Sequence, residues 1–286
     1  MQVALAVDIG GTKLAAGRVG DDGSLLARAQ VPTPKPEDGD AEVWFAAITA
    51  VVDQVREGDE VVCGVGCGGP MEPGGETVSP LNVAQVRGFP LRSRLAAATG
   101  LPTFVDNDAK ALARGEGWVG GAAGVRDFIA MVVSTGVGGG IVLDGRMLDG
   151  LGSNAGHIGH ICVVPDGRPC VCGARGCLEA EASGTAIRAI TGAPAKHAGP
   201  EIRERTGMLV GRAVATAACL LDLKLALVAG SVALGYGDQF FDAAQAELDA
   251  RATIEFARGA RIKRGGLADE GPLVGAACVG FHGLRS

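Results

Sequence analysis

The chain lacks any basic stretch. Among its 286 residues, 26 lysines and arginines are outnumbered by 32 aspartates and glutamates, which gives a formal net charge of −6 at pH 7. Nucleic acids and anionic membrane surfaces are recognised by clustered positive charge. We therefore expect neither a nucleic acid nor a membrane as a partner.

We expect neither a membrane-spanning run nor a signal peptide in this sequence. The most apolar late stretch, 208–235, is interrupted by Arg212, Asp222 and Lys224, so it indicates a buried helix and strand. The first residues, MQVALAVDIGG, contain neither the basic segment nor the cleavage site of a signal peptide. We expect a cytoplasmic protein whose eight cysteines serve as thiols or metal ligands instead of forming disulfides.

Glycine, in contrast, is in excess. The chain has 47 glycines in 286 residues, more than twice the usual share of about 7%. The absence of a G-X-Y period and the presence of only 13 prolines exclude collagen, and 47% hydrophobic with 20% charged residues excludes simple disorder. These glycines are expected to form turns, close packing contacts or ligand cradles among apolar segments.

Two stretches of the chain are alike. Residues 3–32 and 128–148 each contain an apolar run, a glycine turn with a threonine, a second apolar run and a D-G pair. This pattern predicts an internal repeat, and hence two homologous halves, each with a hairpin-based sheet, facing each other across a cleft. Periodicity and glycine boundaries predict further helices over 41–54, 91–99, 107–118, 183–191, 201–221, 240–251 and 271–281, and strands within 61–70, 102–107 and 224–235.

The glycine turns that follow the repeated strands suit phosphate binding. The turn 8–13 (DIGGTK) lets backbone N–H groups approach phosphate oxygens, Thr12 adds a hydroxyl, and Asp8 ends the strand, where it could hold hydrated Mg²⁺. The turn 134–140 (STGVGGG) repeats this arrangement. Neither turn is a P-loop or a dinucleotide fingerprint, because no helix follows directly. A tight hairpin would explain one such turn alone, but two at matching positions favour phosphate binding.

Two further strand ends carry candidate ligand contacts. The turn at Gly230 could let an adenine or ribose lie against the backbone, although a simple strand-to-helix turn explains it as well. Asp106, Asn107 and Asp108 lie where a strand meets a helix. Helix capping explains one or two of them. The other interpretation is that Asp108 is a general base that accepts a proton from an attacking hydroxyl, with Asn107 binding substrate hydroxyls.

One short loop combines a histidine with three cysteines. The set His160, Cys170, Cys172 and Cys177 lies within 18 residues, and Cys₃His is a common closed set for structural zinc. Buried thiols beside an incidental histidine are the alternative. His157 and Glu179 flank the loop, which could present them to a polyol, or they could be ordinary surface residues. The remaining cysteines, expected to be small core residues, are Cys63, Cys67, Cys162, Cys219 and Cys278.

Together these motifs resemble the ROK family of sugar kinases and repressors, within the actin-like ATPase superfamily. The resemblance covers nearly the whole chain, and the string CVCGARGCLEAEASG at 170–184 is highly specific. It implies an α/β fold with two actin-like (ribonuclease H-like) domains, each a mixed sheet flanked by helices. The first domain would comprise 1–119 plus 270–286, and the second 120–269 with the zinc loop.

The resemblance further implies ATP-dependent phosphorylation of a hexose at its 6-hydroxyl, by a homodimer. Asp108 matches the catalytic base. The matching sugar-binding residues are Gly69, Asn107, Asp108, His157, His160 and Glu179. The matching nucleotide-binding residues are Asp8, Gly10, Gly11, Thr12, Lys13, Thr135, Gly136, Gly138 and Gly230. ATP, Mg²⁺ and a structural Zn²⁺ held by His160, Cys170, Cys172 and Cys177 are the implied cofactors, with polyphosphate left open as the donor.

One position departs from the family pattern. Where family kinases typically have glutamate in G-E-x-G-H, this chain has His157. A neutral imidazole offers one donor and one acceptor, unlike a carboxylate. Glucose is the expected sugar, and an N-acetylhexosamine (N-acetylglucosamine or N-acetylmannosamine) is the alternative, because its carbonyl could accept from a donor. A sugar-sensing protein without catalysis is a further alternative. The family's repressors carry an N-terminal DNA-binding module, and this chain starts on the first strand, which disfavours that branch.

Overall fold

The computed structural model describes residues 1–286, and the chain forms two compact units. Unit 1 comprises 1–124, 147–155 and 269–286, and unit 2 comprises 125–146 and 156–268. The segment 147–155, which the sequence groups with the second domain, belongs to unit 1 by its contacts.

Unit 1 contains a five-stranded mixed sheet in the order β3-β2-β1-β4-β5. Its strands are β1 (Val3–Ile9), β2 (Lys13–Gly20), β3 (Leu25–Pro32), β4 (Val62–Cys67) and β5 (Thr103–Asn107). The first three strands pair antiparallel, and β4 and β5 run parallel to β1. Every residue of β1 and β4 is buried, as expected for central strands covered on both faces.

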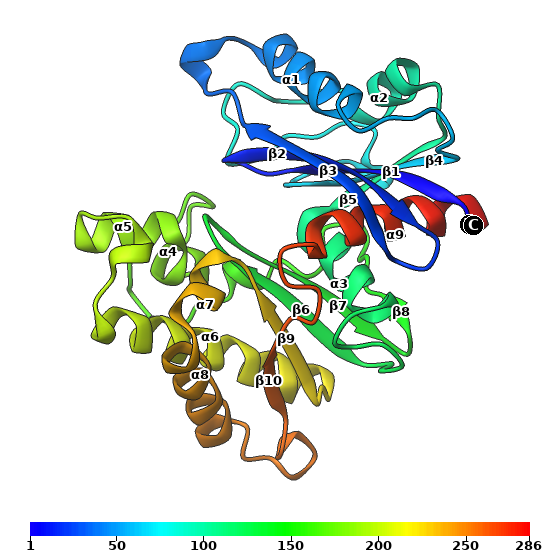
Figure 1. Ribbon diagram of the computed structural model, residues 1–286. Helices are drawn as coiled ribbons and strands as arrows, with labels where there is room; N and C mark the ends of the chain where they lie inside the picture. The colour runs from blue at the N-terminus through cyan, green and yellow to red at the C-terminus, as the bar shows by residue number, and fades with distance from the viewer. The chain divides into compact units, whose positions relative to one another are not determined.

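Helices cover both faces of this sheet (Figure 1). One face contacts α1 (Ala41–Asp53) and α2 (Leu91–Thr99), and the other contacts α3 (Asp108–Trp118) and α9 (Gly271–Arg285). The small residues of α9 allow a close approach, because a Cβ on Gly64 of β4 would lie 2.0 Å from the carbonyl oxygen of Ala276.

Unit 2 repeats this plan with a sheet in the order β10-β9-β6-β7-β8. Its strands are β6 (Phe128–Val133), β7 (Val137–Leu143), β8 (Arg146–Met147), β9 (Leu225–Ala229) and β10 (Arg261–Arg264). β6 pairs antiparallel with β7 and parallel with β9, which pairs parallel with β10. The predicted internal repeat is therefore confirmed, because both sheets have a hairpin followed by two parallel strands.

In unit 2 the most extensive helix contact is between α6 (Pro200–Leu221) and α8 (Asp238–Arg251). A Cβ on Gly211 of α6 would lie 2.2 Å from the carbonyl oxygen of Ala244 in α8. The helices are α4 (Leu178–Ala182), α5 (Gly184–Thr191), α6 (Pro200–Leu221), α7 (Ser231–Tyr236) and α8 (Asp238–Arg251). The short 3₁₀ helices of the chain are η1 (Pro36–Asp38), η2 (Pro73–Gly75), η3 (Ile158–His160), η4 (Ala195–His197) and η5 (Glu255–Ala257).

The predicted helices and strands all appear, with ends that shift by a few residues. No helix of the chain combines the length and the apolar character needed to cross a membrane. The prediction that the remaining cysteines are core residues is wrong for Cys162, which is exposed in the irregular segment after η3, whereas Cys63 and Cys67 are buried.

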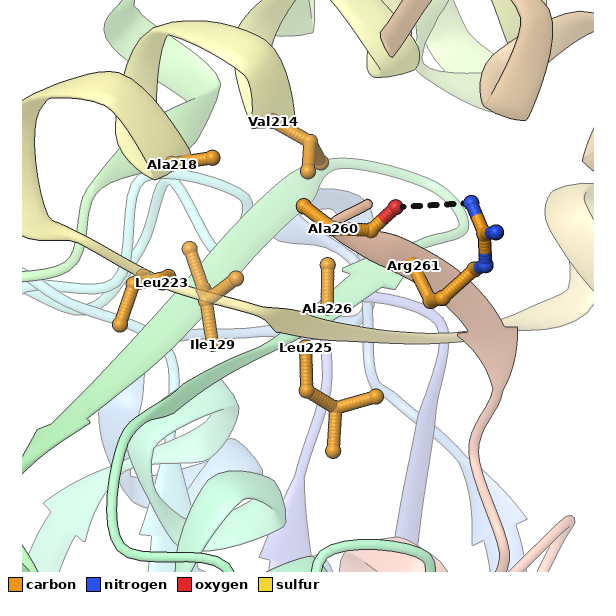
Figure 2. Close-up of a pocket in the computed structure, with 8 residues that line it drawn as sticks. All are labelled: Ile129, Val214, Ala218, Leu223, Leu225, Ala226, Ala260 and Arg261. Carbon is orange, nitrogen blue, oxygen red and sulfur yellow. Dashed lines mark hydrogen bonds between the residues drawn. The ribbon is translucent and has the colours of Figure 1, made fainter. Parts of the chain in front are cut away.

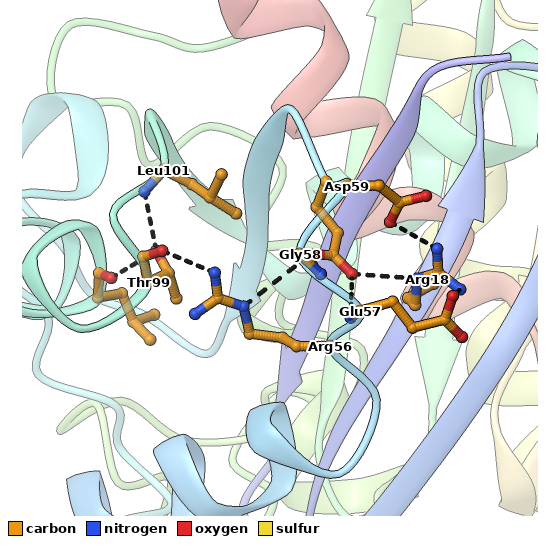
Figure 3. Close-up of polar contacts among 9 residues, drawn as sticks. Arg18, Arg56, Glu57, Gly58, Asp59, Thr99 and Leu101 are labelled. Atoms are coloured by element: carbon orange, nitrogen blue, oxygen red, sulfur yellow. Dashed lines mark hydrogen bonds and ion pairs between the residues drawn. The ribbon is translucent and has the colours of Figure 1, made fainter.

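An ion-pair cluster around the buried Arg18 and Glu60 stabilises unit 1 away from the strand ends that carry the candidate site. Figure 3 shows Arg18 of β2 surrounded by the acidic loop 57–60. The buried Glu60 carboxylate accepts from Arg18 Nε at 3.0 Å and from the backbone N–H groups of Glu57 and Gly58. Burial opposes ionisation of Glu60, but these hydrogen bonds and the Arg18 charge leave its pKa below the ordinary value. The cluster therefore has a structural role.

Candidate functional site

Three parallel strands of unit 1 end at the same edge of its sheet. The register pairs Ile9 of β1 with Cys67 of β4, and Cys67 with Asn107 of β5. Polar residues that follow or end these strands are therefore neighbours. Asp8 and Asp108, which the sequence singled out separately, come within electrostatic range of each other here.

Asp8 is a buried carboxyl, with only 8% of its surface exposed. Burial and the nearby Asp108 carboxylate raise its pKa to about 7, although the Lys13 ammonium opposes the shift. Two carboxylates at one strand edge favour a cation beside them, because a positive charge offsets both the burial and the repulsion. Oxygen ligands of this kind suit Mg²⁺.

We expect the contribution of Asp8 to the stability of the free protein to fall as the pH rises from about 4 to 7. The folded state keeps the Asp8 proton up to a pKa of about 7, while the unfolded chain loses it near 3.8. Asp8→Asn removes this dependence. The variant is expected to exceed the wild type in unfolding free energy at pH 8 by up to about 4 kcal/mol, and by little at pH 4.

Urea denaturation at pH 4, 6 and 8, without Mg²⁺ or nucleotide, measures this difference. The exposed Asp53→Asn is the control. A stability gap between Asp8→Asn and wild type that does not change with pH would contradict the expectation.

The first glycine turn is a closed hairpin. The Gly10 N–H donates to the Lys13 carbonyl at 3.0 Å, and the Thr33 hydroxyl donates to the Gly10 carbonyl at 2.7 Å. A Cβ on Gly11 would lie 2.7 Å from the Cβ of Asn82. Asn82 thus packs directly against Gly11. This contact by itself requires a glycine at position 11, in addition to any requirement of a ligand.

Asn107 caps α3, and its side chain is therefore partly engaged. Its Oδ1 accepts from the backbone N–H groups of Ala109 at 3.0 Å and Lys110 at 3.3 Å. The capping prediction is thus confirmed for this residue, and the amide NH₂ is the group left for a ligand. Asp108 is the first residue of the helix, and its Oδ1 accepts from Ala109 N–H at 2.9 Å.

Gly69 lies on the same side of unit 1 as the strand ends. It follows β4, precedes Pro70 through a cis peptide bond, and its carbonyl accepts from Leu81 N–H at 3.1 Å. A Cβ on Gly66, in β4, would lie 3.5 Å from the Cα of Asp108. Unit 1 therefore brings the candidate base, the first glycine turn and the Gly69 segment to one region.

In unit 2 the second and third glycine turns meet. Ser134 N–H closes the second turn on the Gly136 carbonyl at 2.9 Å, and the Ser134 hydroxyl is 2.9 Å from that of Ser231. Thr135 offers its carbonyl to the Thr185 hydroxyl at 3.0 Å. Gly230 has φ +99°, and a Cβ there would lie 2.4 Å from the Val133 carbonyl oxygen, so only glycine fits this contact.

Glu179 and the two histidines lie beside the second turn. Glu179 Oε2 accepts from the Val137 N–H at 2.9 Å, which leaves its other oxygen to a ligand. The His157 and His160 rings are stacked, with centroids 6.0 Å apart. Unit 2 thus groups its three predicted sugar-binding side chains.

The predicted metal ligands form one cluster. The ligand atoms of His160, Cys170, Cys172 and Cys177 all lie within 4.8 Å of one another. Cys172 and Cys177 sulfurs are 3.7 Å apart, as are the Cys170 sulfur and His160 Nδ1. A tetrahedron with bonds of about 2.3 Å has edges of roughly 3.8 Å, so the spacing fits a four-coordinate zinc.

The thiols of the cluster differ in pKa, and hydrogen bonding, first from the Ala174 backbone, lowers the pKa of Cys172. Burial and the crowding by Cys172 and Cys170 raise the pKa of Cys177 to about 12. A bound divalent cation would reverse this by holding the sulfurs as thiolates. Since Nδ1 of His160 faces the cluster, its Nε2 is the nitrogen left for another partner.

Sequence reasoning missed two charged residues next to the candidate base. Lys110 is buried in α3 and pairs with Asp106 at 2.9 Å and with Asp149 at 2.5 Å. The short separation of Asp106 and Lys110, across the junction of β5 and α3, was a usable signal. Asp149 carried no signal, because its segment is distant in sequence.

A small apolar depression in unit 2 carries no site. It lies among α6, β6, β9 and β10 (Figure 2), and it leaves no room for a water-sized ligand. Arg261 supplies its polar contact, to the Ala260 carbonyl at 3.4 Å. Its lining residues are Ile129, Val214, Ala218, Leu223, Leu225, Ala226, Ala260 and Arg261.

Comparison with known proteins agrees with the resemblance. The family model described as "ROK family" matches residues 4–280. An N-acetylmannosamine kinase of Citrobacter koseri is 38% identical over 248 residues, covering 82% of this chain and 84% of the relative. A glucokinase of Streptomyces coelicolor is 40% identical over 188 residues, covering 65% of this chain and 58% of the relative, so the match spans little more than half of that glucokinase.

A solved structure is similar along the whole chain. The ROK family glucokinase from Streptomyces griseus, in complex with glucose and AMPPNP, has a TM-score of 0.86 and 30% identity, covering 98% of this chain and 99% of that one. The two mixed sheets flanked by helices are the fold of that structure. The chain therefore belongs to the ROK family.

Proposed function

We propose that the protein is an ATP-dependent hexose kinase that phosphorylates the 6-hydroxyl of its sugar. The observation that carries the proposal is the meeting of Asp8, Lys13 and Asp108 at one strand edge of unit 1. A carboxylate base beside a phosphate-binding turn is the arrangement that phosphoryl transfer needs. The kinases among the similar proteins support the same activity.

In this reaction Asp108 orients the attacking hydroxyl and accepts its proton. Asp8 would hold Mg²⁺, which supplies charge neutralisation at the phosphates. The turn residues Gly10, Gly11, Thr12 and Lys13, with Thr135, Gly136 and Gly138, would contact the phosphates, and Gly230 would allow the adenosine to lie against the backbone. The AMPPNP in the Streptomyces griseus structure supports ATP as the donor.

The predicted sugar-binding residues keep hydrogen-bonding groups that a sugar could use. Asn107 has its amide NH₂ to donate, Glu179 has one carboxylate oxygen to accept, and His160 has Nε2 opposite the metal cluster. Gly69 and His157 complete the proposed set. A structural Zn²⁺ at His160, Cys170, Cys172 and Cys177 would fix the orientation of the His160 ring.

Glucose is the first candidate sugar, and N-acetylmannosamine is the second. The imidazole of His157, unlike a carboxylate, can donate to an N-acyl carbonyl. The Citrobacter koseri relative, matched over most of both chains, supports this second candidate.

A substrate panel tests the proposal. Purified protein is assayed for ADP release with glucose, mannose, N-acetylglucosamine and N-acetylmannosamine, each with ATP and with polyphosphate. We expect turnover of glucose or of an N-acetylhexosamine with ATP. Sugar binding without turnover on any member of the panel would refute the kinase and favour a sugar sensor.

A further inference from the structure

Lys110 is a buried cation to which the proposed reaction gives no task. It lies in the first turn of α3, two residues after Asp108, and only 1% of its surface is exposed. Removing an ammonium from water is costly unless acceptors surround it. An unbranched apolar side chain would fill similar space without that cost, so the charge itself calls for an explanation.

Three oxygens surround the ammonium. Its Nζ lies 2.9 Å from Asp106 Oδ1, 2.5 Å from Asp149 Oδ1 and 3.5 Å from the Ser153 carbonyl oxygen. The three N–H groups of a lysine are thus matched by three acceptors. Asp106 belongs to β5, and Asp149 and Ser153 belong to the loop 147–155.

Through Asp106, Lys110 acts on the residues that carry the candidate chemistry. The Asp106 carboxylate also accepts from Arg114 Nε at 3.1 Å and from the Asn107 backbone N–H at 2.8 Å. Lys110 and Arg114 therefore hold the Asp106 carboxylate in place, and this carboxylate in turn holds the backbone N–H of Asn107. Asn107 in turn caps the helix on which Asp108 is the first residue.

Through Asp149, Lys110 holds the loop 147–155. This loop belongs to unit 1, while the residues before and after it belong to unit 2. Hydrogen bonds within the loop close it on itself, such as Ala155 N–H to the Asp149 carbonyl at 3.0 Å. Its Leu151 side chain is fully exposed. The ion pair to Lys110 anchors this exposed loop to the end of β5.

We propose that Lys110 is a positioning residue for the sugar acceptor. Its ammonium holds Asn107, Asp108 and the loop 147–155 in one arrangement, so that the acceptor side of unit 1 is formed before the sugar binds. This inference rests on the proposed function, since it takes Asn107 and Asp108 as sugar contacts. Neither Lys110 nor Asp149 touches the sugar in this scheme.

Steady-state kinetics of Asp149→Asn and Lys110→Met tests the proposal. Misplaced hydrogen-bonding groups weaken sugar binding, so we expect the sugar KM to rise about 10- to 100-fold. The KM for ATP should stay within about twofold, because the first glycine turn is untouched. Asp149→Glu keeps a carboxylate and should recover most of the sugar affinity.

The matched control is Glu42→Gln. It removes one carboxylate from the exposed Arg94–Glu42 pair of the same unit, on helices α1 and α2. Its kinetics should equal those of the wild type. Asp149 is half exposed, so Asp149→Asn should fold even if Lys110→Met does not.

Two kinetic outcomes would overturn the proposal. One is a wild-type sugar KM in Asp149→Asn. The other is an equal loss of sugar and ATP affinity together with a lower melting temperature, which indicates general destabilisation. If the wild type phosphorylates no sugar of the panel, the proposed function fails. The anchoring of the loop 147–155 is then measured by amide hydrogen exchange in the free protein. Faster exchange of the 147–155 amides in Asp149→Asn supports the anchor, and unchanged exchange refutes it.

Discussion

Asp108→Asn is expected to lower the kcat of sugar-dependent ADP release by about 10³-fold, within the usual range for loss of a general base. Asparagine keeps the size and the oxygen that accepts from the Ala109 N–H, so the helix start is preserved. It cannot accept the proton of the attacking hydroxyl. The loss should therefore fall on kcat, with the KM for ATP within about threefold.

The measurement is a coupled ADP assay at saturating sugar and ATP, with metal content determined on the same samples. The control is Asp53→Asn, an exposed carboxylate at the end of α1. Zinc content should be the same in wild type and both variants. If Asp108→Asn kept more than a tenth of the wild-type kcat, Asp108 would not be the base.

Loss of the metal cluster should produce the second large effect. Cys172→Ser is expected to abolish stoichiometric zinc binding, because three ligands remain where a closed structural site uses four. Zinc binding contributes folding free energy directly. The loop 170–177 should lose its order, and the sugar KM should rise strongly. Glu179 transmits this effect, because it lies in the first turn of α4, which begins directly after Cys177.

Cys162→Ser is a closely matched control. Cys162 is an exposed thiol in the same segment, outside the ligand cluster. Elemental analysis of the purified variants gives zinc per chain, and isothermal titration gives sugar affinity. Full sugar affinity in a zinc-free Cys172→Ser protein would refute the idea that the metal positions Glu179 and His160.

The fold was largely predictable because its signals are local or repeated. The similar stretches 3–32 and 128–148 predict two similar sheets, and the matching strand orders of the two sheets confirm this prediction. The helix at 91–99 was predicted to the residue, because Pro90 precedes it and Gly100 ends it in a left-handed conformation. The cysteine cluster was predictable for a similar reason, since its four ligands lie within 18 residues of sequence.

What depends on distant contacts could not be predicted. The Lys110–Asp149 pair joins residues 39 positions apart, and no periodicity connects a helix start with an irregular loop. No sequence pattern predicts the contact of Asn82 with Gly11 either. The sequence predicts a ligand contact at Gly11, and the structure adds the packing of Asn82 against the same residue. Composition reveals that a close approach exists, but not what approaches.

The matching strand orders of the two sheets have a consequence for how the chain has diverged internally. In unit 1 the fifth strand, β5, ends at Asn107 and leads into Asp108, while its counterpart in unit 2, β10, ends at Arg264. Likewise β1 ends beside the acidic Asp8, and its counterpart β6 ends at Val133. At the compared strand ends only unit 1 carries acidic groups, and unit 2 holds the cysteine cluster. The two units share one strand order but carry different functional groups. A defect in the functional groups of one unit therefore cannot be compensated by the other.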